Sequence, residues 1–414
     1  MTQQLAPQKT KKAFLWNALC GSPLFDLLSQ LDLILIQELG VAGFQLGVFF
    51  ALKPGCSLLS PYWSAIIHRR QDLVKMNLVL ANLLRYLPFL FFPFYQNTWL
   101  LIGSLAVYWI MEKGMKPAWM EFFRATLPEG MREKVCSLGL KINYCSNIAF
   151  PLVFIHILAK QWMSWQGLFS LTALVGMSST LFMLVLPGLA LTKNKQKKPS
   201  LGRLMVRPLR DVVQLLRTDP FFLRFQLAFF LGGAGLILVY PAVRAFLAVD
   251  LQLTYVEIMR ASMVGKGIGF ILASPIWVKQ FSRFSLLKLS RAIMALTLCF
   301  PCLLAFGHLD LLFIYGAYFL YGVMQAGSGL VWNLSGPSYA KDRPSSVYTT
   351  ANLLAVGVRG ALFPFVGTYL MGQVGYVATF FIGGGVILAG IVLVTSFIRL
   401  EAREALQWKE LASR

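Results

Sequence analysis

The chain has 414 residues, of which 57% are hydrophobic and only 13% are charged. An average soluble domain is about one quarter charged, so this composition excludes an ordinary soluble protein and is typical of a chain embedded in a membrane. The net charge of +21 would fit a nucleic-acid-binding protein, but the basic residues lie in short loops between apolar segments, which argues against a nucleic-acid partner.

The first apolar segment follows a basic N-terminus, as in a signal peptide. It contains Asp26, Gln30 and Asp32, and no small-residue cleavage site follows a short apolar core, so we expect it to be retained as the first membrane span. A span needs about 20 apolar residues. Twelve segments qualify: 14–38, 44–67, 74–95, 99–123, 135–159, 166–187, 221–247, 255–278, 286–306, 311–335, 346–371 and 376–398. The predicted fold is an all-α membrane protein with twelve transmembrane helices.

Positive charge alternates along the predicted loops. With the N-terminus in the cytoplasm, the basic loops, the basic central segment and the basic tail all face that side, and the opposite loops contain one lysine, Lys160. This distribution follows the positive-inside rule and predicts that both termini are cytoplasmic.

The two halves of the chain share short motifs at a nearly constant spacing. Ser60–Trp63 (Ser-Pro-Tyr-Trp) recurs as Ser274–Trp277 (Ser-Pro-Ile-Trp), Lys53 has Lys266 as its counterpart, and a Phe-Pro pair recurs in the fifth span of each half. We therefore expect a duplicated six-helix unit, which is a known transporter plan. The predicted organisation is a six-helix bundle over 1–187, a basic cytoplasmic linker over 188–219, a second bundle over 220–398 and a cytoplasmic tail over 399–414.

With twelve spans, two halves and a basic central loop, the chain resembles a transporter of the major facilitator superfamily. The loop after span two is similar to the family's gating-loop motif, although His68 stands where the family has an aspartate; Arg69 fits the motif, and Arg70 and Arg283 are assigned to the same cytoplasmic gating loops. Segments 127–132 and 357–367 also resemble family patterns. The resemblance implies two bundles that rock around a central site, and a transporter rather than an enzyme.

Cationic residues within the spans outnumber acidic ones, and ionisable groups at this depth usually face a cavity or a partner. Lys53 and Lys266 occupy equivalent places, and either clamp an anionic substrate or take part in ion pairs that hold a closed state. Arg359 either contacts the substrate or pairs with an acidic residue on a neighbouring helix. Asn143 and Asn147 are four residues apart on one face and either bind a polar solute or join helices.

The acidic residues within the spans are candidates for ion coupling. Asp26 is either a proton or cation site or the structural partner of Lys53. Asp32 lies six residues on, which is about 600° of helical rotation, so the two carboxylates are expected on different faces. Glu112 is a third candidate, but it and Lys116 are four residues apart and can satisfy each other.

These observations predict a secondary active transporter, acting as a monomer in a bacterial inner membrane, that moves a small anionic organic solute by symport or antiport. Its partners would be that solute, membrane lipids and a coupling proton or cation. The sequence has no phosphate-binding loop, and no pattern predicts a metal or another cofactor. A multidrug or lipid exporter with hydrophobic or cationic substrates is the alternative. A polytopic membrane enzyme is a distant one, because no nucleophile–base or metal constellation is found.

Overall fold

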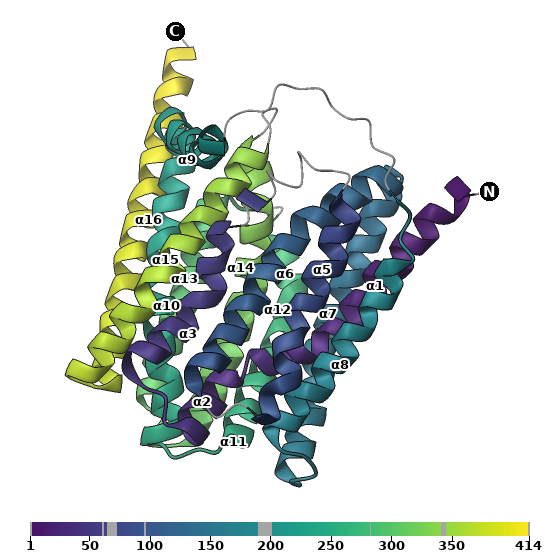
Figure 1. Cartoon of the computed structure of the whole chain (residues 1–414). Coiled ribbons are helices and arrows are strands. Elements are labelled where there is room, and N and C mark those ends of the chain that lie inside the picture. The colour runs from purple at the N-terminus through teal and green to yellow at the C-terminus, as the bar shows by residue number, and fades with distance from the viewer. Residues whose placement is uncertain are drawn as a thin grey trace. The chain divides into compact units, whose positions relative to one another are not determined.

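The computed structural model describes residues 2–59, 62–63, 73–94, 97–188, 201–281, 283–340 and 345–412. Every regular element in this part is helical, as predicted (Figure 1). The chain forms two compact units. The first comprises Met1–Val41 and Gly55–Met205, and the second comprises Ala42–Pro54 and Val206–Arg414.

The first unit is built around α1, which packs against α7 and α8, while α5 packs against α6 and α8. A cluster of buried apolar side chains from several of these helices, including Leu78, Phe122 and Met183, forms its core. Its elements are α1 (Thr2–Leu28), α2 (Leu31–Leu39), η1 (Cys56–Leu59), α5 (Val74–Tyr86), η3 (Leu87–Phe94), α6 (Thr98–Thr126), α7 (Glu129–Ala159) and α8 (Trp165–Leu184).

The second unit is built around α10, which packs against α15 and α16, while α14 packs against α12 and α13. The α3 helix also belongs to it, because Phe50 contacts Tyr240 of α10 and Phe44 contacts Phe365 of α15. Its elements are α3 (Gly43–Gly55), α9 (Leu201–Thr218), α10 (Pro220–Ala245), η4 (Phe246–Asp250), α11 (Tyr255–Arg260), η5 (Ala261–Gly265), α12 (Lys266–Phe281), α13 (Leu286–Ala305), α14 (Leu311–Ala340), α15 (Ser345–Val374) and α16 (Tyr376–Ala412).

In the part of the chain that the structure describes, each of the twelve predicted spans overlaps a helix or an interrupted helix, but not all are equally suited to lipid. Within the described residues, nine helices are long and apolar enough to cross a membrane, and Gly43–Leu59 and Ala149–Ala159 are shorter apolar helices. The α6 helix is long enough, but it contains Glu112, Lys113 and Lys116. The chain is therefore an integral, multi-pass membrane protein, and the count of twelve stays a prediction, as does the orientation.

The first predicted span is interrupted rather than continuous. Ser29 and Gln30 form a turn between α1 and α2, so Asp26 and Asp32 lie on separate helices. The expected rotation of about 600° between them assumed one unbroken helix and does not apply. Asp32 instead lies in the first turn of α2, where a carboxylate interacts favourably with the helix dipole.

The tryptophan of the Ser-Pro-x-Trp repeat has the same packing in both units. The indole of Trp63 covers Gly114 of α6, and the indole of Trp277 covers Gly327 of α14. In both places the ring atoms Cε2, Cδ2 and Cζ2 occupy the space that a Cβ on the glycine would need, at 2.5 to 2.9 Å. Two glycines at equivalent places, each covered by the same atoms of an equivalent tryptophan, support duplication of a helical unit.

Two boundaries differ from those predicted. Residues 42–54 fall within the predicted first bundle but belong to the second compact unit. The predicted tail over 399–414 is not a separate segment in the described part, because α16 continues to Ala412. Arg224 of α10 holds the extension through two bonds to Glu404, at 3.0 and 2.7 Å.

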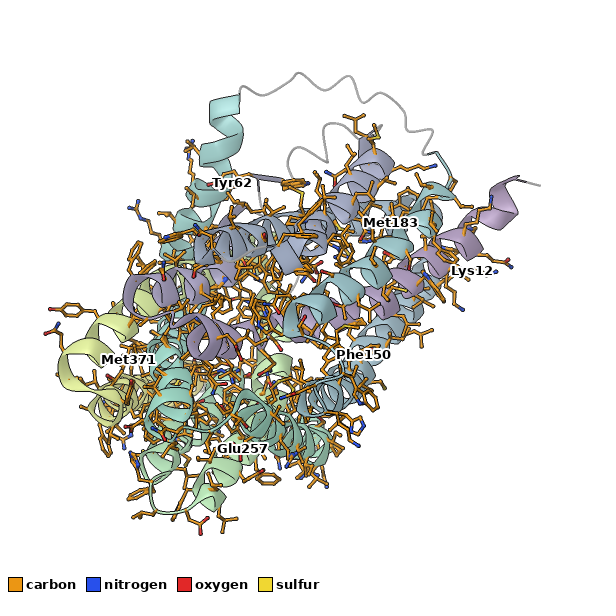
Figure 2. The ribbon with its side chains drawn as sticks, turned by 60° about the horizontal axis from the view of Figure 1, so that its bottom comes forward. Lys12, Tyr62, Phe150, Met183, Glu257 and Met371 are labelled. Carbon is orange, nitrogen blue, oxygen red and sulfur yellow. The ribbon has the colours of Figure 1, made fainter. Side chains whose placement is uncertain are left out.

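The side chain of Glu257 caps the start of a short helix. Its carboxylate accepts hydrogen bonds from the backbone N–H of Thr254 at 2.9 Å and from the Thr254 hydroxyl at 2.8 Å. The Thr254 hydroxyl in turn accepts from the Glu257 backbone N–H. This reciprocal capping box begins α11, where Glu257 is labelled in Figure 2.

Candidate functional site

Arg359 is the most unusual charged group of the second unit. It extends from α15 to α10, where a terminal guanidinium nitrogen donates a hydrogen bond to the Phe229 carbonyl at 2.6 Å. The guanidinium lies 4.7 Å from the centroid of the Phe229 ring, and it occupies the space that a side chain at Gly233 would need. Arg359 is only 7% exposed, and its Nε has no hydrogen-bond partner. In the described part of the chain, no carboxylate pairs with it.

Aromatic side chains form a platform beside this guanidinium. Phe229 stacks on Phe225, with ring centroids 5.6 Å apart, and on Trp332 of α14, with centroids 5.8 Å apart. The Arg359 cation therefore lies over the middle ring of an aromatic group that joins α10 to α14, an arrangement that stabilises a cation by its attraction to the ring face.

Amide side chains on α10 and α15 lie along the same helix faces as Gly233 and Arg359. Gln226 donates to the Asn352 carbonyl oxygen, and the Asn352 amide donates to the Ser335 hydroxyl at 2.8 Å. Gln226 and Gly233 are seven residues apart, as are Asn352 and Arg359, so each pair lies on one face of its helix. The second unit thus presents a polar stripe of two amides, a hydroxyl and one guanidinium.

The two lysines of the predicted clamp lie on different helices of the second unit. Lys53 is exposed in the last turn of α3, and Lys266 is half-buried at the start of α12, directly after the π-helical η5. The backbone of Lys266 touches Gly322 of α14, which fixes the position of this end of α12. The anion clamp by Lys53 and Lys266 stays a prediction.

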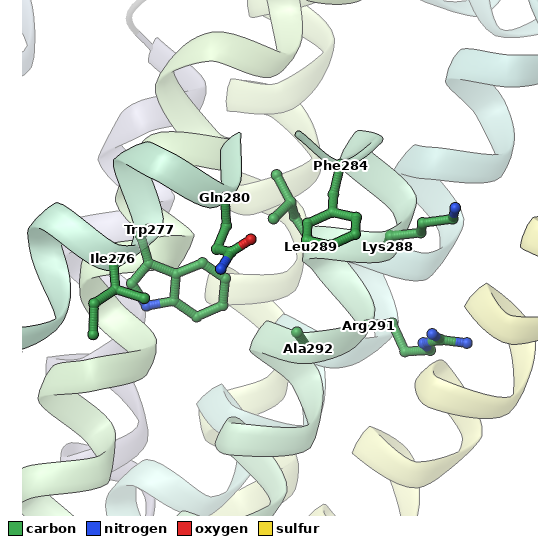
Figure 3. Close-up of a pocket in the computed structure, with 8 residues that line it drawn as sticks. All are labelled: Ile276, Trp277, Gln280, Phe284, Lys288, Leu289, Arg291 and Ala292. Atoms are coloured by element: carbon green, nitrogen blue, oxygen red, sulfur yellow. The ribbon is translucent and has the colours of Figure 1, made fainter. Parts of the chain in front are cut away.

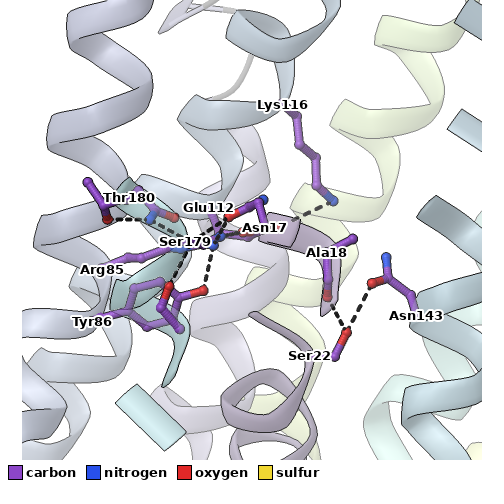
Figure 4. Close-up of polar contacts among 12 residues, drawn as sticks. Asn17, Ala18, Ser22, Arg85, Tyr86, Glu112, Lys116, Asn143, Ser179 and Thr180 are labelled. Carbon is purple, nitrogen blue, oxygen red and sulfur yellow. Dashed lines mark hydrogen bonds and ion pairs between the residues drawn. The ribbon is translucent and has the colours of Figure 1, made fainter. Parts of the chain in front are cut away.

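The first unit has a buried ion pair between Arg85 of α5 and Glu112 of α6 (Figure 4). Arg85 also donates to the Asn17 side chain of α1 at 2.8 Å and to the Tyr86 hydroxyl at 2.6 Å. Lys116, the partner that sequence spacing predicted for Glu112, lies 4.0 Å from the other carboxylate oxygen and is 64% exposed. Arg85 is therefore the main partner of Glu112, and its contacts on three helices give it a structural role.

Further polar contacts join α5, α8 and α1 around this pair. The Asn82 amide donates to the hydroxyls of Ser179 at 3.0 Å and Thr180 at 2.7 Å, and Ser179 donates to Asn17 at 3.4 Å (Figure 4). Four helices are thus fixed by groups whose hydrogen bonds are mostly satisfied within the protein. Such a network holds helices together in a membrane more readily than it binds a solute.

The remaining polar candidates of the first unit lie on α1, α2 and α7. Asn143 accepts a hydrogen bond from the Ser22 hydroxyl at 3.1 Å, so it joins α7 to α1, which is the helix-contact alternative (Figure 4). Asp26 and Asp32 are 4% and 2% exposed, as expected for carboxylates inside a membrane protein. The ion-coupling roles of Asp26, Asp32 and Glu112 stay predictions.

Part of the predicted gating loop lies outside the described residues. His68, Arg69 and Arg70 fall there, and so does the side chain of Asn147. Arg283 is exposed in the turn between α12 and α13. Gating by these residues stays a prediction.

The sequence analysis did not predict the amides of the polar stripe or the aromatic platform. It selected Asn143 and Asn147 because they are four residues apart on one helix face, whereas Gln226 and Asn352 have no second amide at such a spacing. Amides within apolar segments would have been a usable indicator, since a buried amide needs a partner. Phe229 and Trp332 could not be identified in this way, because the sequence does not distinguish aromatic residues that face lipid from those that pack in a core.

A family comparison decides the class of protein. The model of the Major Facilitator Superfamily matches residues 27–364, which is most of the chain. The chain belongs to this superfamily. A search of curated protein sequences finds no significant match.

Solved structures of superfamily transporters have the same fold. A POT family transporter in complex with 5-aminolevulinic acid matches with a TM-score of 0.75 at 12% identity, covering 96% of this chain and 99% of its own. The nucleoside transporter NupG matches with a TM-score of 0.62 at 14% identity, covering 94% and 98%. The human organic anion transporter MFSD10 matches with a TM-score of 0.61 at 14% identity, covering 95% and 100%. At these identities the likeness concerns the fold alone.

Proposed function

We propose that this superfamily member is a secondary active transporter for a small anionic organic solute, driven by an ion gradient or by exchange. The observation that carries the proposal is Arg359, a buried guanidinium for which the described residues supply a carbonyl and a ring face but no carboxylate. Arginine keeps its charge in proteins. An uncompensated charge at this depth costs at least a few kcal/mol, so it usually marks a substrate or ion pathway.

A solute carboxylate or phosphate would complete the contacts of this guanidinium. Its Nε has no hydrogen-bond partner, and planar anions accept two parallel N–H bonds from one edge of an arginine side chain. The aromatic platform under Arg359 would orient the group, and the Gln226–Asn352 amides would offer donors and acceptors to the rest of the solute. Lys53 and Lys266 are proposed to add positive charge to the same pathway.

The structural neighbours support this chemistry by analogy of fold. One is described as an organic anion transporter, and another was solved with 5-aminolevulinic acid, which carries a carboxylate. Asp26, Asp32 and Glu112 are proposed as sites for the coupling proton or cation. Symport, antiport and the inner membrane of a bacterium belong to the same proposal.

The test is a thermal-stability screen of the detergent-purified chain against anionic, neutral and cationic metabolites. A ligand that binds only the folded state at a hundred times its Kd stabilises that state by about 2.7 kcal/mol. We expect an anion to raise the Tm, Arg359→Gln to abolish the shift, and Arg359→Lys to weaken it. The control is Arg224→Gln, which removes a guanidinium that already has a carboxylate partner. Transport of the stabilising anion into proteoliposomes follows.

An exporter of hydrophobic or cationic compounds is the second candidate, favoured by the aromatic platform and by the buried Asp26 and Asp32. Lipophilic cations would then raise the Tm, the shift would require one of these aspartates, and Arg359→Gln would leave it unchanged. That pattern would overturn the anion proposal.

A further inference from the structure

A groove of about 320 Å³ lies between the end of α12 and the start of α13, apart from the Arg359 site (Figure 3). Its inner surface is apolar. Trp277 and Leu289 are 9% and 4% exposed, while Ile276 and Phe284 are exposed at its sides. The Trp277 indole N–H donates to the Val323 carbonyl of α14 at 2.8 Å, so the ring is held in place. The groove therefore has a fixed apolar wall rather than a mobile one.

Two cations lie at one side of this groove. Lys288 and Arg291 are three residues apart on α13, and Figure 3 shows both side chains extending to the same side, away from Ile276 and Trp277. Both are exposed, and no carboxylate of the described residues pairs with either. Their positive charge is therefore available to a headgroup at this outer side of the groove.

The beginning of α13 adds to this positive character. Ser285 occupies the N-cap position of this helix, but its side chain makes no capping hydrogen bond. The first-turn N–H groups of a helix favour an anion, and Lys288 belongs to that turn. Arg283, in the preceding turn, carries a further positive charge and is exposed.

We propose that this groove binds one anionic phospholipid, with its phosphate on Lys288 and Arg291 and the beginning of an acyl chain along Trp277 and Leu289. An apolar wall beside paired cations matches the two parts of such a molecule, whereas free phosphate would use only the cations. The positive-inside distribution predicts that this end of α12 lies at the cytoplasmic surface, where anionic headgroups attract basic residues. Trp277 also suits the depth at which a membrane passes from hydrocarbon to headgroups.

The test measures lipid binding to the full-length, detergent-purified chain by native mass spectrometry, with phosphatidylglycerol, phosphatidylcholine and inorganic phosphate as probes. Each basic residue near an anionic lipid surface is worth about a fivefold factor in binding. Replacement of both cations, in Lys288→Gln/Arg291→Gln, is therefore expected to raise the Kd for phosphatidylglycerol about 25-fold. Ala292→Trp, which fills the groove without changing charge, is expected to weaken the same binding.

The matched control is Arg399→Gln/Arg403→Gln, which removes two exposed cations from α16 and leaves the groove intact. It is expected to retain phosphatidylglycerol as the unmodified chain does. The proposal is overturned if the control loses lipid equally, if phosphatidylcholine binds as tightly, or if inorganic phosphate displaces the lipid at equal concentration. Melting curves without added lipid identify any variant that has failed to fold. If either Ala292→Trp or Lys288→Gln/Arg291→Gln fails to fold, the lipid affinity of the other variant still tests the proposal.

Discussion

Loss of one partner of the buried pair between Arg85 and Glu112 is expected to destabilise the first unit strongly. The Arg85 side chain is 4% exposed and that of Glu112 is 19% exposed. Arg85→Leu would leave the Glu112 carboxylate with only Lys116, at 4.0 Å, and would also remove donors to Asn17 and Tyr86. Removing one member of a buried pair costs about 3–5 kcal/mol, because the other charge stays desolvated.

The partial exposure of Glu112 places Arg85→Leu near the lower end of that range. Glu112→Leu should cost at least as much, since Arg85 is the more buried group and would keep only neutral partners. The double variant, Arg85→Leu/Glu112→Leu, is expected to lose much less than the sum of the two, because no buried charge remains. The free energy of unfolding is measured by SDS titration in mixed micelles for all four proteins.

The double-mutant cycle gives the result that decides this argument. A coupling energy of at least about 2 kcal/mol is expected for groups in direct contact. Lys116→Gln is the control, since it removes an exposed cation beside the same carboxylate and is expected to cost no more than about 0.5 kcal/mol. If the two leucine substitutions prove additive, or if Lys116→Gln costs as much as Arg85→Leu, the pair does not hold the unit together.

Two further predictions concern packing and capping. Gly114→Ala would bring a methyl group into the Trp63 ring and is expected to destabilise by about 1–3 kcal/mol in the same titration, whereas Gly103→Ala, on the same helix with nothing within 4 Å, should be neutral or slightly stabilising. Equal effects of the two would contradict the packing. Asp219 caps α10 by accepting from the Phe222 N–H at 3.0 Å and also accepts from the Tyr348 hydroxyl at 2.9 Å. Asp219→Ala is expected to cost about 1–2 kcal/mol, and Asp219→Asn, which keeps a capping oxygen, clearly less; an equal loss for both would mean that the cap contributes little.

Arg85 of the first unit and Arg359 of the second are both buried, but they differ in how their charge is compensated. In the first unit Arg85 has a carboxylate, an amide and a hydroxyl as partners, and its role is to join helices. In the second unit Arg359 has a carbonyl and a ring face. An anionic solute would therefore gain more from Arg359 than from Arg85, although sequence position alone marks both as arginines within apolar helices.

The sequence by itself determined the class of protein and the approximate position of each helix. Length of apolar runs and the scarcity of charge are properties of composition, and lipid requires helices to satisfy their own backbone groups. The repeated motif, on which the predicted duplication depends, was also visible as Ser60–Trp63 and Ser274–Trp277. The structure adds that Trp63 covers Gly114 of α6 and that Trp277 covers Gly327 of α14.

Only the tertiary structure decided which charges meet. Spacing along one helix predicted Lys116 as the partner of Glu112, but Arg85 on another helix lies nearer to that carboxylate. The interruption at Ser29 and Gln30 likewise separated two aspartates that an unbroken helix would have related. Partners on different helices depend on how the helices pack, and a single sequence carries no direct record of those contacts. For the same reason the unmatched guanidinium of Arg359 and its aromatic platform became visible only when α10, α14 and α15 were seen together.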